Sequence, residues 1–282
     1  MNLLQCLLTG NDCYQAGQTI TPRGVMVHST GANNPSLGRY VQPLEGAADY
    51  DGLIAALGYN RNGNDWNRSG TNACVHAFIG KLADGSIASV QTLPWTMRGW
   101  HAGNGTTRPS ANNTHISFEI CEDGLDDGAY FAQVYQEAVE LTAYLCRLYG
   151  LDPRDPQVVL CHSEGCRLGM ASNHADVEHW FPKFGKSMDD FRADVAREME
   201  DEEMTQEQFD AMLEDYLSRR ALQEPSDWSA DSRAWAEQKG ILQGMGDLDG
   251  DGVSDFAYKS FCTREELVTI LDRLERGTQA DA

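Results

Sequence analysis

The sequence lacks any long apolar run, and it is poor in basic residues. No stretch approaches the roughly 18 consecutive apolar residues of a membrane-spanning helix, so we expect no membrane span. Its 22 Lys and Arg are outnumbered by 43 Asp and Glu, and the formal net charge is −21. Because nucleic-acid binding requires clustered cations, this balance argues against DNA or RNA as a partner. With 41% hydrophobic residues, the chain is expected to form a globular core.

Cys-x-x-Cys pairs are also missing, and we do not expect the N-terminus to be an export signal. Most of the eight cysteines lie in apolar stretches, where a reduced cysteine behaves as a small hydrophobic residue, so free thiols are favoured over a disulfide framework. The N-terminal leucines follow no basic segment, and the polar residues Gln5 and Thr9 interrupt them. This pattern is not that of a signal peptide, and a cytoplasmic protein is expected unless something else releases it.

The first 197 residues alternate between strand-like and helix-like patterns. Such interleaving predicts an α/β fold, with a mixed central sheet flanked by helices. The expected strands cover residues 24–30, 74–80, 87–93, 115–121 and 158–160, with a turn at 83–86 joining the second and third. The expected helices cover residues 46–57, 131–148 and 187–200, and Gly150 ends the middle one.

The remainder of the chain is predicted to contain a linker and a small module. Residues 198–203 are almost all acidic, which indicates a linker or, nearly as well, a solvated helix end. An acidic helix is expected over residues 205–222. The predicted domains are therefore residues 1–197, an acidic linker and helix over residues 198–225, and a small helical C-terminal module over residues 226–282. A capping box at Thr263–Glu266 should start the last helix of that module.

Histidine is scarce, with seven residues, and two of them have informative positions. His28 and His162 each follow an apolar strand, where α/β sheets commonly carry functional groups. One histidine in such a place is more often structural, but two favour a shared metal site because imidazole suits zinc. A hydrolytic zinc needs a third protein ligand and an open position. Spacing alone does not choose among Cys166, His174, Asp176 and His179.

Five blocks in order resemble the type-2 N-acetylmuramoyl-L-alanine amidases, which share a fold with the peptidoglycan recognition proteins. The blocks are V-M-V-H-S at 25–29, residues 75–85, G-W-H-A-G at 99–103, N-T-H-I-S-F-E at 113–119 and C-H at 161–162. The resemblance covers residues 20–185, and five blocks are far more specific than any one alone. It implies hydrolysis of the amide bond between N-acetylmuramic acid and L-alanine in bacterial peptidoglycan.

The resemblance also implies roles for individual residues. It assigns His28, His162 and Asp176 as ligands of Zn²⁺. The zinc ion would lower the pKa of a bound water toward about 7. It makes Glu119 the catalytic base and gives His174 the part of an oxyanion-stabilising lysine.

Two departures leave alternatives open. The family's K-x-D-P-G piece corresponds to His174-Ala175-Asp176 without the Pro-Gly, so His174 competes with Asp176 as third ligand. Val75 stands where some relatives carry a tyrosine, which excludes a tyrosine-based mechanism. Without the resemblance, Glu119 would be read as a carboxylate on the solvent face of a strand.

The remaining aromatic and histidine residues of the blocks are read by context. Trp100 and His101 resemble the wall of a substrate groove, and the amphipathic indole suits stacking against a sugar face. His76 is interpreted as a buried, hydrogen-bonded histidine in the middle of a strand. His115 and His179 are interpreted as structural.

The C-terminal module contains a loop that begins like a calcium-binding EF-hand. Asp247, Asp249, Asp251 and Asp255 occupy ligand positions of that loop, but Tyr258 stands where a bidentate glutamate is needed. A partial Ca²⁺ site and an acidic turn without metal both remain open. The surrounding pattern resembles one surface-layer-homology-like repeat, a type of module that anchors proteins to bacterial cell walls.

The sequence therefore predicts a zinc-dependent amidase of bacterial peptidoglycan, of the phage or prophage endolysin type, acting on the wall after release by another protein. A non-catalytic peptidoglycan receptor of the same fold is the first alternative, and a zinc peptidase that cuts stem peptides is the second. The sequence indicates neither the host nor the oligomeric state.

Overall fold

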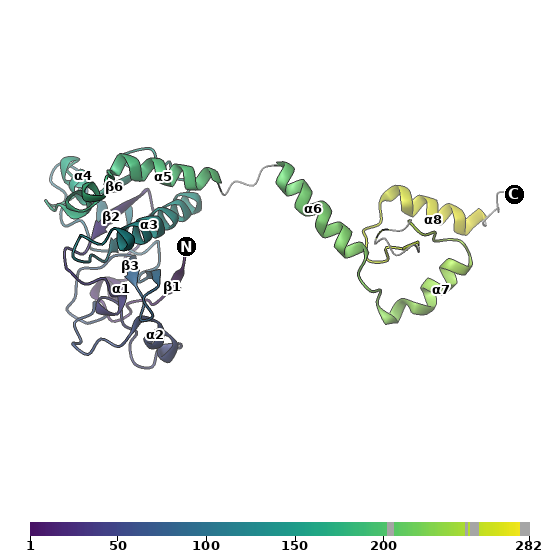
Figure 1. Cartoon of the computed structure of the whole chain (residues 1–282), viewed down its shortest axis with the longest axis horizontal. Coiled ribbons are helices and arrows are strands. Elements are labelled where there is room, and N and C mark those ends of the chain that lie inside the picture. Colours follow the sequence, from purple (N-terminus) through teal and green to yellow (C-terminus); the bar gives the residue numbers. More distant parts are fainter. Residues whose placement is uncertain (202–205, 246–247, 249–253, 277–282) are drawn as a thin grey trace. The chain divides into compact units, whose positions relative to one another are not determined.

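The computed structural model describes residues 1–201, 206–245, 248 and 254–276. Two compact units make up the chain, Met1–Glu203 and Met204–Ala282 (Figure 1). No helix within the described ranges is long and apolar enough to cross a membrane. All eight cysteines are free thiols.

The first unit is built on a six-stranded sheet with the order β1-β4-β3-β5-β2-β6. β3 and β4 form an antiparallel hairpin, and the other neighbouring strands run parallel, so the predicted mixed α/β class is confirmed. The strands are β1 (Leu3–Gln5), β2 (Gly24–Ser29), β3 (Ala77–Lys81), β4 (Ile87–Gln91), β5 (His115–Ile120) and β6 (Val159–Cys161).

The centre of the sheet is buried on both faces. Every residue of β2 is buried, as is usual for a parallel strand with both faces covered. A Cβ at Gly24 would lie 2.4 Å from the carbonyl oxygen of Val158, so only glycine lets these two segments approach so closely. In the β2–β5 register, His28 is the direct partner of Glu119. This pairing brings two chemically active residues side by side.

Two long helices pack together against the sheet, α3 (Gly128–Tyr149) and α5 (Met188–Asp201) (Figure 1). The side chain of Asp127 caps α3 by accepting hydrogen bonds from the backbone N–H groups of Ala129 and Tyr130, and Gly150 ends the helix in the left-handed conformation. The shorter elements are α1 (Asp12–Ala16), α2 (Tyr50–Leu57), α4 (His162–Arg167), and the 3₁₀ turns η1 (Leu37–Arg39), η2 (Ala111–Asn113), η3 (Asp176–His179) and η4 (Phe181–Phe184).

Two features differ from the sequence-based expectations. The second strand begins at Ala77 instead of residue 74, because Cys74 pairs with Trp100 in an isolated bridge and His76 lies at a bend before β3. Leu3 and Leu4 belong to the edge strand β1, which was not predicted. The acidic residues 198–201 form the last turn of α5, in agreement with the alternative reading of this segment as a helix end, and residues 202–203 lie outside the described residues.

The second unit contains α6 (Gln206–Ala221), η5 (Asp227–Ser229), α7 (Ala230–Gln238) and α8 (Arg264–Arg276). The predicted capping box is present: the Thr263 hydroxyl accepts from the Glu266 backbone N–H, and the Glu266 carboxylate accepts from that of Thr263. Three of the predicted calcium ligands, Asp247, Asp249 and Asp251, lie outside the described residues. The fourth, Asp255, accepts a hydrogen bond from the backbone N–H of Leu248.

The cap of α3 allows a test of how much Asp127 contributes to the stability of this helix. Replacing Asp127 by Ala leaves two backbone N–H groups without their acceptor, and we expect the free energy of unfolding to fall by about 1 kcal/mol. Urea unfolding followed by circular dichroism measures the change. The exposed neighbour Asp126, changed to Ala, is the control, and an equal loss there would contradict the capping account.

Candidate functional site

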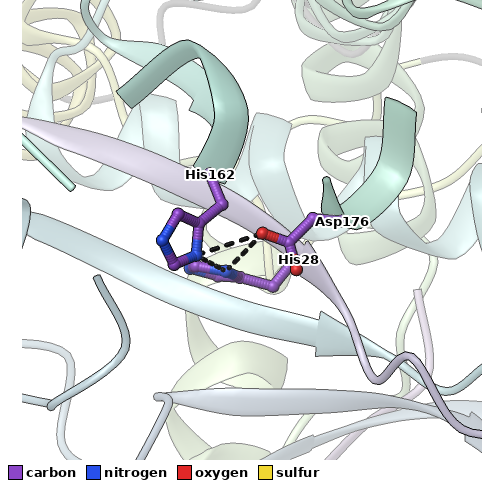
Figure 2. Close-up of side chains that lie close together, drawn as sticks. All are labelled: His28, His162 and Asp176. Carbon is purple, nitrogen blue, oxygen red and sulfur yellow. Dashed lines mark hydrogen bonds and ion pairs between the residues drawn. The ribbon is translucent and has the colours of Figure 1, made fainter. Parts of the chain in front are cut away.

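Three side chains from separate elements converge where β2 and β6 end. His28 lies near the end of β2, His162 is the first residue of α4 directly after β6, and Asp176 begins η3. Their potential ligand atoms all lie within 4.8 Å of one another (Figure 2). Oδ2 of Asp176 is 3.1 Å from Nδ1 of His162 and 3.5 Å from Nδ1 of His28. The structure thus brings together the three residues that the resemblance assigned to zinc.

The donor set of this cluster fits a metal ion. Two imidazole nitrogens and one carboxylate oxygen form a ligand set that zinc takes in hydrolytic enzymes, with a fourth position left for water or substrate. Oδ2 of Asp176 is buried and receives no well-aligned hydrogen bond from any described residue, although the two imidazoles lie close to it. A buried carboxylate oxygen normally has a hydrogen-bond partner, so this atom is suited to a ligand bond instead.

The environment also favours the protonation states that ligation needs. Burial lowers the pKa of His28, and this outweighs the opposing influence of Asp176, so the imidazole stays neutral. Burial raises the pKa of Asp176, but the imidazoles of His162 and His28 more than offset this and hold the pKa below its usual value. A neutral imidazole and an ionised carboxylate are the forms that bind metal.

Asp176 has an uncommon backbone conformation. Its φ angle is +42°, in the left-handed region that residues other than glycine seldom adopt. Aspartate tolerates this region better than most residues, and such conformations are found where a functional constraint holds them. The turn at Asp176 aims its carboxylate back toward the two histidines (Figure 2).

Glu119 lies beside this cluster on an interior strand of the sheet. Its Oε2 atom is buried and has no hydrogen-bond partner among the described residues. Burial raises the pKa of Glu119 well above its ordinary value, and the nearby carboxylates of Asp176 and Glu122 raise it further. Because β5 runs between β3 and β2, the reading of Glu119 as a carboxylate on a solvent-facing edge does not hold.

A pocket of about 510 Å³ opens over these residues. Its lining includes His28, Glu119, His162 and Asp176, together with Trp100, His101, His174 and His179. Among the described residues, the potential metal cluster holds Asp176 and leaves out His174, so the geometry favours Asp176 as third ligand. His174 is exposed in the loop before η3, and its ring centroid is 4.7 Å from that of His162. Trp100 lines the pocket under the guanidinium of Arg98.

The other histidines divide into two groups. His76 is buried and its ring contacts the carbonyl oxygen of Met97 at 2.7 Å, and His115 contacts that of Gln157 at 3.1 Å, as a structural reading requires. His179 differs from its structural reading because it lines the pocket and pairs with the buried carboxylate of Glu122 at 2.9 Å. In the sequence, the signal for this location was that His179 follows Asp176 by three residues, which places both in one turn.

A buried arginine that sequence reasoning did not single out supports the turn carrying His162. Arg192 of α5 donates to both carboxylate oxygens of Glu164 and to the carbonyl oxygen of Val159. Glu164 in turn accepts from the backbone N–H of Cys161. This bidentate pair fixes the β6–α4 junction, and with it the start of the helix on which His162 lies.

Solved structures of other proteins are similar to part of this chain. The chain resembles the structure of the Staphylococcus aureus hydrolase AmiA in complex with its ligand, with 19% identity over 71% of this chain and 83% of that one and a TM-score of 0.47. It also resembles a mutant endolysin from Bacillus subtilis, with 23% identity over 69% of this chain and 99% of that one and a TM-score of 0.44. No curated protein matches the chain.

A comparison with protein-family models shows which family the chain belongs to. A family model described as N-acetylmuramoyl-L-alanine amidase matches residues 18–179, more than half of the chain, and the match contains every residue of the cluster together with Glu119 and Trp100. The chain therefore belongs to the N-acetylmuramoyl-L-alanine amidase family, whose reaction is hydrolysis of the bond between N-acetylmuramic acid and L-alanine in bacterial peptidoglycan.

Proposed function

We propose that this amidase is zinc-dependent, with His28, His162 and Asp176 as ligands and with Glu119 and His174 as the catalytic residues. The observation that carries the proposal is the cluster of three potential ligand atoms within 4.8 Å, open to the pocket that Glu119 also lines. When bound, zinc supplies Lewis acidity toward water and toward the scissile carbonyl group.

The protein's own groups supply the proton transfers. Glu119 has a buried carboxyl group whose raised pKa suits a base that takes a proton from water and returns it to the leaving amine of L-alanine. Glu119 is the direct partner of His28 in the strand register, so its carboxyl group lies next to a proposed zinc ligand and within the same pocket.

His174 and Trp100 act on the substrate from the pocket wall. Since His174 lies outside the ligand cluster, its imidazole is free to donate a hydrogen bond to the carbonyl oxygen as negative charge develops there. The indole of Trp100 offers an apolar face against which a sugar ring stacks.

The C-terminal unit is proposed to bind the cell wall. Two tryptophans support this, since the side chains of Trp228 and Trp235 are 88% and 50% exposed in a unit that buries few apolar residues. Exposed aromatic side chains of this kind are suited to carbohydrate contacts.

Two substitutions separate the ligand role from the catalytic role. We expect Asp176→Ala to lose both zinc and wall lysis, because it removes one of three ligands. We expect His174→Ala to keep zinc and to lose about 10²- to 10³-fold in rate, because only oxyanion stabilisation is removed. Metal analysis after dialysis and the clearing of a wall suspension measure the two properties.

The outcomes distinguish the alternatives. If His174→Ala loses the metal while Asp176→Ala keeps it, the ligand assignment is wrong. A parent protein that binds wall but holds no zinc and lyses nothing is a receptor. Mass spectrometry of the digest identifies the bond, because an amidase releases intact stem peptides with a free L-alanine amine and a stem peptidase does not.

Glu119 is tested by its conservative amide. Glu119→Gln should retain zinc and lose about 10²- to 10⁴-fold in kcat, since the base is gone. In the parent, the rate should fall as the pH drops through the pKa of Glu119, because protonation removes the base. The exposed Glu45, changed to Gln, is the control and should retain full activity.

The same group makes a stability prediction for the metal-free protein. Because the pKa of Glu119 is raised in the folded state, folding binds a proton there, and stability declines as pH rises above the unfolded-state value. At pH 8 the melting temperature of metal-free Glu119→Gln should therefore equal or exceed that of the parent. A lower value would show that the ionised carboxylate is stabilised by contacts other than those described.

A further inference from the structure

In both imidazoles of the cluster, the ring nitrogen that faces away from Asp176 contacts another side chain. Nδ1 of His28 and Nδ1 of His162 face Asp176, so the Nε2 atoms point away from the cluster. Nε2 of His28 lies 3.1 Å from Nδ1 of His101, and Nε2 of His162 lies 3.2 Å from the Ser172 hydroxyl. Each contact is within hydrogen-bond distance.

The two supporting residues belong to one hydrogen-bonded unit. The backbone N–H of Ser172 donates to the carbonyl oxygen of Ala102 at 2.8 Å. The side-chain oxygen of Asn112 accepts from the backbone N–H groups of both His101 and Ala102, each at 2.8 Å. A Cβ at Gly103, whose φ is +63°, would lie 2.8 Å from the Ser172 hydroxyl oxygen. These segments, about 70 residues apart in the sequence, are thus fitted closely to each other.

The hydrogen-bond roles follow from the ligand geometry. An imidazole that binds metal through Nδ1 carries its proton on Nε2, so His28 donates to His101 and Nδ1 of His101 must accept. The proton of neutral His101 is then on its own Nε2, which is buried and has no hydrogen-bond partner within the part of the chain that the structure describes. Buried polar atoms without a partner are rare in folded proteins, and each calls for an explanation. Here the explanation is that the other nitrogen of His101 is committed to His28.

We propose that His101 and Ser172 are positioning residues, which fix His28 and His162 in the orientation and tautomer that bind metal through Nδ1. The inference rests on the proposed metal site and adds two residues that contact its histidine ligands. It also adds a role for His101, which lines the pocket, because its Nδ1 faces the ligand His28 and its Nε2 is buried. Both partners are neutral acceptors, an imidazole nitrogen and a hydroxyl oxygen.

The test measures zinc affinity of the full-length chain by competition with a chromophoric chelator. We expect His101→Leu to bind zinc about 10- to 100-fold more weakly than the parent, the usual effect of losing the partner of a metal-binding histidine. His101→Asn should stay within about threefold of the parent, because its side-chain oxygen replaces the Nδ1 acceptor. Ser172→Ala should weaken binding by about 10-fold, and it tests the proposal independently should a His101 variant fail to fold.

A matched control separates positioning from general destabilisation. His115 is also a buried histidine, at the opposite end of β5 from Glu119, and it contacts a carbonyl oxygen instead of the cluster. His115→Leu should lower the melting temperature while its zinc affinity stays that of the parent. Ring-nitrogen NMR of the zinc-loaded protein gives a second readout: Nε2 of His28 should be protonated and hydrogen-bonded in the parent and lose that hydrogen bond in His101→Leu.

Each outcome is decisive. If the parent binds zinc and both His101→Leu and Ser172→Ala bind it equally well, the positioning roles are wrong while the metal site stands. If His115→Leu weakens zinc binding as much as His101→Leu does, the effect is general destabilisation and the inference fails. If the parent binds no zinc, the proposed function itself is overturned, and the inference with it.

Discussion

The parallel pairing of β2 with β5 on one side and β6 on the other is the constraint on which the site depends. Parallel strands end at the same edge of a sheet, so the residues that finish them are neighbours whatever their separation in sequence. His28, Glu119 and His162 meet for this reason. The hydrophobic burial of these strands therefore determines the geometry of this site, and a shift of register by one residue would turn His28 or Glu119 to the other face of the sheet.

This arrangement explains how polar groups are tolerated in a buried place. His28 and His162 are almost wholly buried, and Asp176 is largely so. Burial of such groups is costly unless they are paired or bound to metal. The protein meets that cost with pairwise contacts inside the cluster and with His101 and Ser172 behind it. Oε2 of Glu119 finds no hydrogen-bond partner in the described part of the chain, and burial raises the pKa of this carboxyl group, as is common at functional sites.

Much of the site could be predicted because its residues follow strong local patterns. His28 and His162 terminate unbroken apolar strands, and Glu119 and Trp100 lie in blocks typical of the family. The choice of Asp176 over His174 was different, since both are polar residues in one loop and only the folded turn distinguishes them. The three-residue strand β1 is too short to show an alternating pattern, and its existence depends on pairing with β4. The roles of His101 and Ser172 depend on which ring nitrogen faces which neighbour, and no sequence pattern encodes that.

The clamp made by Arg192 has a consequence for how the protein is made. Residues 18–179 carry all the groups that meet at the metal cluster, yet the turn bearing His162 is held by an arginine from the following helix, α5. During synthesis the N-terminal part of a domain emerges first, so Glu164 leaves the ribosome well before its partner does. The site is therefore completed late, once α5 has docked against α3 and the sheet. A nascent chain that ends at residue 179 contains His28, His162 and Asp176 but lacks the arginine that holds the β6–α4 junction.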